Sequence, residues 1–436
     1  MLFTGTIGLA FALASLSAFA QGQYSGPTSV EEYRKLHPYV YPYAVYRPET
    51  YIRPSKNETD DVSAEFYWGL KNANNGGRLV LPKNQTFVIG KKLDLTFLKD
   101  VEVNLEGKIL FTNDIAYWQA NNFYHPFQES ISFWKWGGED IKIYGSGTLD
   151  GNGQQWWDAY AGQQLVDKFS TYLRPILFYA ENTTNLHVEG IRFQGSPCWT
   201  NFIVTSKDVV YDKVVIENVS ANKNRPKNSD GLDSYNVDGL TVRDSWFNTG
   251  DDCYSAKPNS SNIHVENMYC NGTHGMSMGS IGQYAGVKDY IVNAHFENVA
   301  MLNGKNGARL KIRAGKDVGY GFIDNITFNN FQIEKTDWPI VLDACYLDLN
   351  ATECAKYPSQ VDVTNIHFSN FRGRTSGRKG RKVAFLVCSP GAVCTNITLD
   401  NIELTSPKGS PTEILCNGIT GGVGMPCIPT NGTTDD

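Results

Sequence analysis

Charge is scarce in this sequence. Only 19% of its 436 residues are Asp, Glu, Lys or Arg, and the net charge is −6. Without a basic excess, the chain is not expected to bind nucleic acid, and a polyanionic ligand would have to be held by a few local cations. A Ser-His-Asp or Cys-His nucleophile motif is also missing. Gly, Asn and short β-branched or aromatic runs are abundant instead, which favours an all-β globular protein.

Lys and Arg are absent from the first twenty residues. Met1–Ala20 is an apolar run ending in Ala18-Phe19-Ala20, with small residues at both positions that signal peptidase reads. The run is too short to span a bilayer comfortably, and polar chain follows at once. We therefore interpret it as a signal peptide cleaved after Ala20 rather than a membrane anchor, and expect a secreted, extracellular protein that does not bind membranes.

Cysteine is sparse, but its placement suits an oxidising compartment. Eight of the nine cysteines fall into sequence-near pairs, which predicts disulfides between Cys253 and Cys270, Cys345 and Cys354, Cys388 and Cys394, and Cys416 and Cys427. Cys198 is left over and is expected to be a buried free thiol beside Trp199. Ten Asn-x-Ser/Thr sequons suit a secreted glycoprotein, at Asn57, Asn84, Asn182, Asn218, Asn259, Asn271, Asn325, Asn350, Asn396 and Asn431.

A repeated pattern dominates the chain from about Arg78 onward. It reads Asn, aliphatic, any residue, aliphatic or Phe, any residue, Asn or Gly, apolar. Full copies start at Asn185, Asn262, Asn325, Asn365 and Asn396, and weaker ones start near Asp140, Lys213, Gly239 and Asn293. With a spacing of roughly 23 to 40 residues, the copies indicate a solenoid or a propeller.

The alternation inside each copy predicts short strands. The variable period and the Asn at turn positions favour a right-handed parallel β-helix over a propeller, with a two-sheet β-sandwich as the alternative. We expect a signal peptide over 1–20, an N-terminal arm and cap over 21–77, and a β-helix over 78–436. The arm would pack over the first turns, and a helix over 60–70 would cap one end.

Four polar motifs lie at nearly even intervals between Asn228 and Lys311. They are Asn228-Ser229-Asp230, Gly250-Asp251-Asp252, Thr273-His274-Gly275 and Arg309-Leu310-Lys311. In a parallel β-helix, equivalent positions of successive coils stack about 4.8 Å apart. The first three motifs are each about one short coil apart, so we expect their acidic and His side chains side by side on one outer face.

Clustered carboxylates raise one another's pKa, because two nearby negative charges cannot both form without cost. One can then stay protonated as a general acid while another acts as a base, which is what glycoside hydrolysis needs. His274 would tune the acid. Arg309 and Lys311 point to the same side of a strand and would meet an anionic sugar. The alternatives are a Ca²⁺ site and Asp side chains that only satisfy turns.

Taken in this order, the four motifs resemble those of the polygalacturonases of glycoside hydrolase family 28. That family shows Asn-Thr-Asp, Gly-Asp-Asp, Gly-His-Gly and Arg-Ile-Lys, and the likeness extends from about Gly137 to Tyr346. Ser229, Thr273 and Leu310 depart from the pattern. The resemblance implies a right-handed parallel β-helix that hydrolyses bonds between α-linked galacturonic acids with inversion and without a cofactor or metal.

Roles for individual residues also come from this resemblance. Asp251 would be the general acid, while Asp230 and Asp252 would hold and deprotonate the attacking water. His274 would support the protonation state of the acid. The substrate-binding residues would be Asn228, Arg309, Lys311 and Tyr346. Carboxylates one coil apart would ordinarily indicate retention of configuration, and on this point we follow the resemblance.

Four further segments resemble the fungal exo-acting branch of the family, at 113–119, 133–136, 148–154 and 279–284. In that branch, longer loops and glycans close the groove into a pocket for a chain end. We therefore expect a monomeric exo-polygalacturonase of the galacturan 1,4-α-galacturonidase type, acting on non-reducing ends of pectin. The alternatives are an exo-acting rhamnogalacturonan or xylogalacturonan hydrolase, an endo-polygalacturonase, a calcium-dependent pectate lyase and a pectin-binding β-helix without catalysis.

Overall fold

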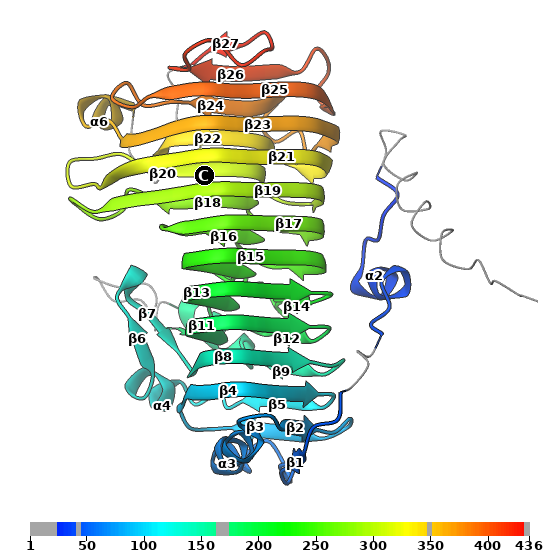
Figure 1. Ribbon diagram of the computed structural model, residues 1–436. Helices are drawn as coiled ribbons and strands as arrows, with labels where there is room; N and C mark the ends of the chain where they lie inside the picture. The colour runs from blue at the N-terminus through cyan, green and yellow to red at the C-terminus, as the bar shows by residue number, and fades with distance from the viewer. Residues whose placement is uncertain (1–23, 41–44, 163–173, 347–350, 431–436) are drawn as a thin grey trace, which may run out of the picture.

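The protein is a parallel β-helix, as the repeat predicts (Figure 1). The computed structural model describes residues 24–40, 45–162, 174–346 and 351–430. The predicted signal peptide and the sequons at Asn350 and Asn431 lie outside the described residues. Most coils begin on a long strand that bends and continues onto a second face: β4 (Leu93–Leu105), β8 (Trp134–Tyr144), β11 (Phe178–Glu189), β13 (Asn201–Asp212), β15 (Leu232–Asn248), β17 (Ser260–Asn271), β19 (Lys288–Leu302), β21 (Tyr320–Thr336), β23 (Gln360–Thr375) and β25 (Cys394–Thr405).

Shorter strands complete the coils. One set comprises β3 (Thr86–Ile89), β5 (Lys108–Phe111), β9 (Thr148–Asp150), β12 (Arg192–Gln194) and β14 (Val215–Glu217). The other comprises β16 (Tyr254–Ala256), β18 (Met276–Ile281), β20 (Asn306–Arg313), β22 (Trp338–Tyr346), β24 (Lys382–Val387), β26 (Glu413–Asn417) and β27 (Ile428–Pro429). The first residues of β11 pair with those of β13, and these pair with the first residues of β15. The first residues of β15 pair with β16, and the stack continues in order through β18, β20, β22 and β24. We call this stack the site face.

The Asn residues of the repeat form two ladders at the bends. Asn262, Asn293 and Asn325 all have positive φ, and the amide of each later residue donates to the amide oxygen of the one before it. The sixth position of the pattern repeats the arrangement at Asn267, Asn298 and Asn330. Asn tolerates this left-handed backbone, and its amide can both donate and accept along a stack. This explains why Asn recurs at these two positions.

The aliphatic and Phe positions of the repeat fill the interior. Phe296, Phe328 and Phe368 occupy one register and stack, with ring centroids 4.8 Å and 5.2 Å apart. All three are fully buried in a core that runs the length of the solenoid. Each coil therefore buries its apolar side against its neighbours, and loops can vary without disturbing the stack.

The N-terminal segment covers one end and one side of the solenoid. The helix predicted over 60–70 forms as α3 (Ser63–Ala73), whose Phe66 and Leu70 are buried in the core at the first coils. Strand β1 (Glu49–Tyr51) pairs with β2 (Arg78–Leu81). Helix α2 (Val30–Leu36) lies farther along than the predicted first turns, because Tyr33 packs with Trp246 and Tyr269 of the middle coils.

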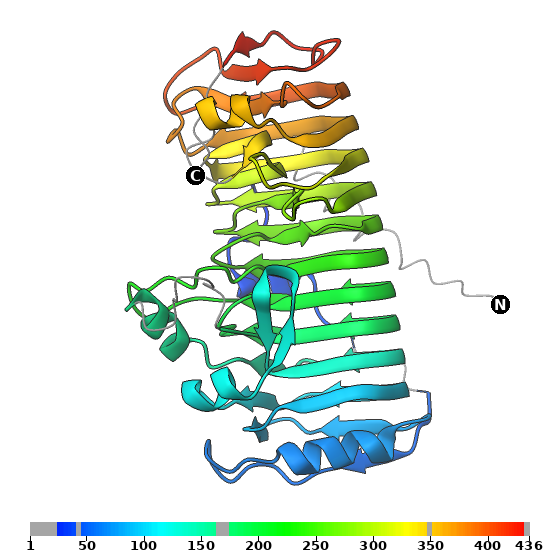
Figure 2. The same ribbon diagram turned by 90° about the vertical axis from the view of Figure 1, so that its left-hand side faces the viewer.

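A hairpin stands across the coils in Figure 2. It consists of β6 (Phe123–His125), the short η2 (Phe127–Glu129) and β7 (Ser130–Ser132), which pairs with β10 (Pro175–Ile176). The small helices α4 (Ile115–Ala120) and α5 (Gln154–Ala161) lie before and after this hairpin in the chain. The arrangement matters for function because the hairpin covers part of the site face, as shown below.

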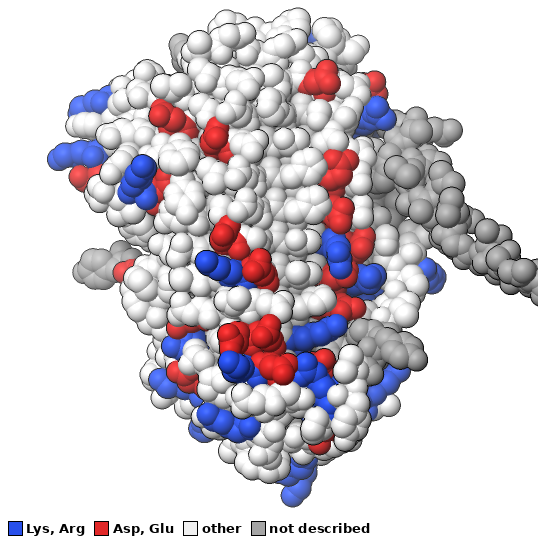
Figure 3. All heavy atoms as spheres, in the orientation of Figure 1, with Lys and Arg blue, Asp and Glu red and all other residues white. Residues whose placement is uncertain are grey.

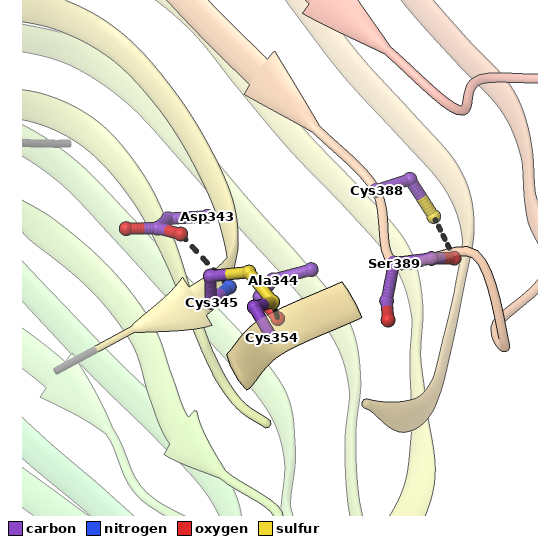
Figure 4. Close-up of a disulfide and its surroundings, with 6 residues drawn as sticks. All are labelled: Asp343, Ala344, Cys345, Cys354, Cys388 and Ser389. Atoms are coloured by element: carbon purple, nitrogen blue, oxygen red, sulfur yellow. Dashed lines mark hydrogen bonds between the residues drawn. A yellow bond between two sulfur atoms is a disulfide. The ribbon is translucent and has the colours of Figure 1, made fainter. Parts of the chain in front are cut away.

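The four disulfides are those predicted from sequence proximity, and Cys198 is a buried free cysteine, also as predicted. Figure 4 shows the Cys345–Cys354 bond, which joins the end of β22 to α6 (Ala351–Lys356). The Cys345 amide also donates to Asp343 at 2.9 Å. Both links hold the chain next to Tyr346. Among the described residues, no helix is long and apolar enough to cross a membrane.

Candidate active site on the site face

Three carboxylates meet just before two strands of the site face. Asp230 precedes β15, and Asp251 and Asp252 precede β16. The amide of Gly231 donates to the Asp252 carbonyl at 2.9 Å, which stacks the two turns one coil apart. One carboxylate oxygen of each of the three residues lies within 4.8 Å of the others. The predicted convergence of the acids is therefore present.

The turn at Gly250 allows two adjacent acids to share the site. On a regular strand they would diverge, but both lie outside the strands, and the Asp252 amide donates to Asp251 Oδ1 at 2.9 Å. Ser229 Oγ accepts from the Gly250 amide and donates to the Pro226 carbonyl, both at 2.9 Å. A Cβ at Gly250 would lie 1.8 Å from that carbonyl oxygen. Gly250 and Ser229 thus set the turn together.

Asp251 pairs with His274. His274 Nδ1 lies 3.0 Å from Asp251 Oδ1, and both side chains are about one-fifth exposed, at 23% and 21%. Burial raises the pKa of Asp251, but His274 and then Lys311 and Lys257 lower it by more, so the pKa lies below its usual range. Asp251 is thus the acid of the three that is partly exposed to solvent, and an imidazole lies beside it.

Asp252 is fully buried and paired with a cation. Ser277 Oγ donates to Asp252 Oδ1 at 2.8 Å, and Lys311 Nζ donates to Oδ2. Burial is the largest single influence and raises the pKa of Asp252, but Lys311, Lys257 and Arg309 together lower it by more and hold the pKa below the usual range. Lys311 was predicted to bind substrate, and here it contacts a catalytic candidate directly. Asp252 is therefore held ionised and can accept a proton.

Asp230 differs electrostatically from the other two acids. Burial and the neighbouring carboxylates of Asp233 and Asp251 raise its pKa well above the usual range. Lys257 Nζ lies 3.6 Å from Asp230 and 3.0 Å from Asp233, and all three side chains are nearly or fully buried. The pKa of Asp233 is raised to about 6, chiefly by burial. The cluster thus holds a proton above the pH at which free carboxyls lose theirs.

Lys257 and Asp233 were missed as site residues in the sequence. Lys257 directly follows β16, whose last residue Ala256 pairs with Ser234 and Met278 of the neighbouring coils. The signal that could have found Lys257 is the alternation along the strand, which points Ser255 and Lys257 to the same outer side. Its charge would then have been placed beside the acids of the neighbouring coil.

Tyr346 lies among three cations. Its ring centroid is 5.0 Å from the Arg309 guanidinium carbon, 5.6 Å from Lys311 Nζ and 5.5 Å from the Arg313 guanidinium carbon. Cations near an aromatic face are attracted to it, and the ring also limits where they can move. Arg309 and Lys311 are nearly buried on β20 and point to the same side, as predicted.

Asn228 is held at the edge of the site by a buried arginine. Arg174 donates to Asn228 Oδ1 at 2.8 Å and to the carbonyls of Pro197 at 3.0 Å and Lys227 at 2.6 Å. Asn228 lines an open cleft of about 830 Å³ together with Asp251 and His274. All eight predicted site residues therefore belong to one continuous region. Arg174 supports its edge through the hydrogen bonds to Asn228 and Lys227.

The site face is closed on one side of the acids. Phe127 of the hairpin is buried against Tyr179, Trp199, Phe202 and Val204, and its ring lies 4.6 Å from that of Tyr235. The hairpin also contacts the loop after β18, because the Gln128 amide donates to the Tyr284 hydroxyl at 2.7 Å. These apolar side chains occupy the outer side of β11, β13 and β15, where a longer groove would run.

We call Phe127 and the side chains packed around it the apolar wall, and this wall adjoins the catalytic candidates. Trp199 of the wall lies 5.2 Å from Lys257 Nζ, which in turn contacts Asp230. On the other side of the acids, the cleft lined by Asp251 and His274 stays open. The site therefore has one blocked end and one open end.

The carboxylate set does not fit a divalent cation well. Ca²⁺ needs several oxygen ligands turned toward one point. Here Lys311 takes an oxygen of Asp252, Lys257 approaches Asp230 and His274 takes an oxygen of Asp251. Each acid already faces a nitrogen of the protein, which supports proton transfer over the calcium alternative.

Comparison with known proteins agrees with the motifs. Residues 76–427 match the family described as "Glycosyl hydrolases family 28". The chain is 61% identical over 377 residues to a protein of Aspergillus oryzae named "Probable exopolygalacturonase B", covering 86% of this chain and 87% of that protein. It is 60% identical over 384 residues to "Exopolygalacturonase B" of Aspergillus niger, covering 88% and 87%.

Among solved structures, the endo-xylogalacturonan hydrolase of Aspergillus tubingensis aligns with a TM-score of 0.80 and 27% identity, covering 88% of this chain and 99% of that one. The fold also matches an exopolygalacturonase from Thermotoga maritima, with a TM-score of 0.60 and 17% identity over 92% of this chain and 96% of that one. The predicted β-helix is thus confirmed by its neighbours as well as by its own strands.

Proposed function

The chain belongs to glycosyl hydrolases family 28, and from this we propose that it is an exopolygalacturonase that releases galacturonic acid from non-reducing ends of homogalacturonan. Its curated relatives at 60–61% identity carry that activity in their names. The observation that supports exo action best is the apolar wall beside Asp230. A groove that ends next to the acids has room for a chain end and not for a chain passing through.

The position of Asp251 decides which end of the substrate enters. A general acid must lie beside the leaving oxygen, and Asp251 faces the open cleft. The leaving part of the chain would therefore lie in the cleft, and the sugar that keeps its C1 atom would lie at the blocked end. That sugar is the non-reducing terminus.

In the proposed reaction, Asp252 accepts a proton from a water held between Asp230 and Asp252. The water oxygen bonds to C1 of the terminal sugar, and the bond from C1 to the glycosidic oxygen breaks. Asp251 gives that oxygen a proton, which it shares before reaction with Asp230, the acid whose pKa is raised and whose carboxylate lies within 4.8 Å. Arg309, Lys311, Tyr346 and Asn228 would hold the sugars in place. Removal of a positioned acid or base costs about 10²–10⁴-fold in rate.

Product analysis tests the exo proposal. We expect galacturonic acid as the only early product from homogalacturonan, because the apolar wall closes the groove next to the acids. Chromatography of the first few per cent of reaction would show it. A ladder of oligomers at that stage would overturn exo action, and faster release from rhamnogalacturonan or xylogalacturonan would overturn the substrate. An NMR time course in which the α-anomer appears first would contradict inversion.

The pH dependence of kcat should be a bell with widely separated limbs. Asp252 must be ionised, and its lowered pKa places the acid limb below the ordinary carboxyl value of about 4. The shared proton must be present, and the raised pKa of Asp230 places the alkaline limb well above that value. Activity is therefore lost as pH falls through the first value and as pH rises through the second. Initial rates on a trimeric oligogalacturonate across pH 3–8 would measure both; a single limb near pH 4 would contradict this assignment.

We propose further that the protein is secreted and monomeric. Four disulfides suit an oxidising compartment.

One sequon of the ten cannot carry a glycan without local rearrangement, because the buried Asn218 side chain accepts from the Ser196 amide and donates to Thr200.

A further inference from the structure

The open cleft is lined mainly by cations, although the protein as a whole has a negative net charge. The net charge of the protein is −6, and on the face shown in Figure 3 basic and acidic side chains lie in mixed groups. The cleft is lined by five cations and two acids: Arg225, Lys227, Lys305, Lys335 and Arg378 against Asp251 and Asp337. None of these five cations belongs to the predicted site.

Three of the cations follow His274 at successive coils. The Lys305 amide donates to the Thr273 carbonyl, the Asp337 amide to the Gly304 carbonyl and the Ser376 amide to the Thr336 carbonyl. These bonds stack the turns that carry Lys305, Lys335 and Arg378, and each step is about 4.8 Å. One sugar of a polysaccharide is comparable in length to such a step. The turns that carry the three cations therefore repeat at a spacing comparable to that of a uronate chain that leaves the site along the solenoid axis.

The opposite rim of the cleft is fixed in place. Asp158 of α5 accepts from the amides of Asn222 and Asn224 at 2.9 Å and 2.7 Å. Gln154 of the same helix accepts from the Ala221 amide at 2.8 Å. With Arg174 holding the Lys227 carbonyl, the loop that carries Arg225 and Lys227 is tied down at both ends.

The cations themselves are largely free to meet a ligand. Among the described residues, Arg225, Lys227 and Lys305 form no ion pair within 4.0 Å, and all three are exposed. Lys335 lies 3.8 Å from Glu334, and Arg378 lies 3.5 Å from Asp337; their side chains are 67% and 77% exposed. Both cations therefore stay exposed, and ion pairs of exposed side chains are weak, so a ligand carboxylate can compete for these two cations.

We propose that Lys305, Lys335 and Arg378 bind the carboxylates of successive sugars in the departing chain, with Arg225 and Lys227 on the opposite rim. This rests on the proposed function, and it extends the site beyond Arg309 and Lys311 by up to three sugars. The ligand class is an unesterified polyuronate. The enzyme would thereby favour long chain ends without methyl esters over short or esterified ones.

The test compares oligogalacturonates of two to six sugars, each as the free acid and as the methyl ester. For the unaltered enzyme, kcat/KM should rise with length on free acids and rise much less on esters. The triple variant Lys305→Gln/Lys335→Gln/Arg378→Gln should lose about 30-fold in kcat/KM on the free-acid hexamer, from about threefold for each of the three exposed charge contacts. Its loss on the dimer should be much smaller, and its preference for free acids over esters should fall by a similar factor.

Lys408→Gln is the matched control, because Lys408 is exposed and lies outside the cleft. It should leave the length dependence unchanged. An equal loss by the triple variant on all lengths and on esters would refute binding along the cleft and indicate a disturbed site instead. A flat length dependence in the unaltered enzyme would also refute it, while the exo proposal would stand. Failure to release galacturonic acid from any substrate would refute the proposed function itself.

Discussion

Asp251→Asn should lower kcat on homogalacturonan by about 10²–10⁴-fold, equivalent to about 3–5 kcal/mol of transition-state stabilisation. Asn has nearly the same shape and can keep contact with His274 and the Asp252 amide, which now bond to Asp251 Oδ1. It cannot give a proton to the glycosidic oxygen. Initial rates and binding of an oligogalacturonate to the same variant would separate the two effects, since binding should be nearly unchanged.

A leaving group that needs no protonation sharpens this experiment. A nitrophenyl galacturonide should lose much less activity in Asp251→Asn than the polysaccharide does, because nitrophenolate departs unaided. Asp317→Asn, at an exposed acid outside the site, is the control and should act like the unaltered protein. The pKa of Asp230 is raised and that of Asp251 is not, so Asp230 is the competing candidate for the proton donor. If the nitrophenyl substrate restored activity in Asp230→Asn but not in Asp251→Asn, Asp230 would be the proton donor.

Lys257→Met should destabilise the folded protein by about 3–5 kcal/mol, since it leaves two buried carboxylates without their cation. Denaturant unfolding would measure it, with Lys408→Met as the exposed control. Adding Asp233→Asn to Lys257→Met should restore part of the loss, because one of the two uncompensated charges is then removed. If the loss of unfolding free energy in the double variant equalled or exceeded the sum of the two single losses, the two residues would not form the pair described here.

The same residues should move the alkaline limb of the pH profile in opposite directions. Lys257 lowers the pKa of Asp230 and Asp233 raises it. Lys257→Met should therefore shift the limb to higher pH, and Asp233→Asn should shift it to lower pH. Asp233→Asn keeps the lysine paired with Asp230, so it remains informative if Lys257→Met does not fold. Shifts in the same direction would contradict a role for Lys257 in positioning the charge of Asp230.

Much of the fold could be predicted because it is a local pattern repeated. Alternation within each copy specifies strands, and the Asn at two fixed positions specifies the bends, as Asn262 and Asn267 show. Sequence proximity was also sufficient for the disulfides. The N-terminal arm was placed too near the first coils, because its position depends on Tyr33 meeting Trp246, two residues far apart in the chain.

The sequence by itself determined the kind of chemistry, because the period of the repeat brings Asp230, Asp251, Asp252 and His274 together and the motifs carry the resemblance. Only the tertiary structure decided where charge and space lie around them. Lys257 beside Asp230, the wall built by Phe127 and the row of cations beyond His274 all join segments from different coils or loops. The pKa of a carboxyl depends on its burial, and the groove is closed by a loop that is distant in the chain. Neither can be predicted from the spacing of residues along one strand.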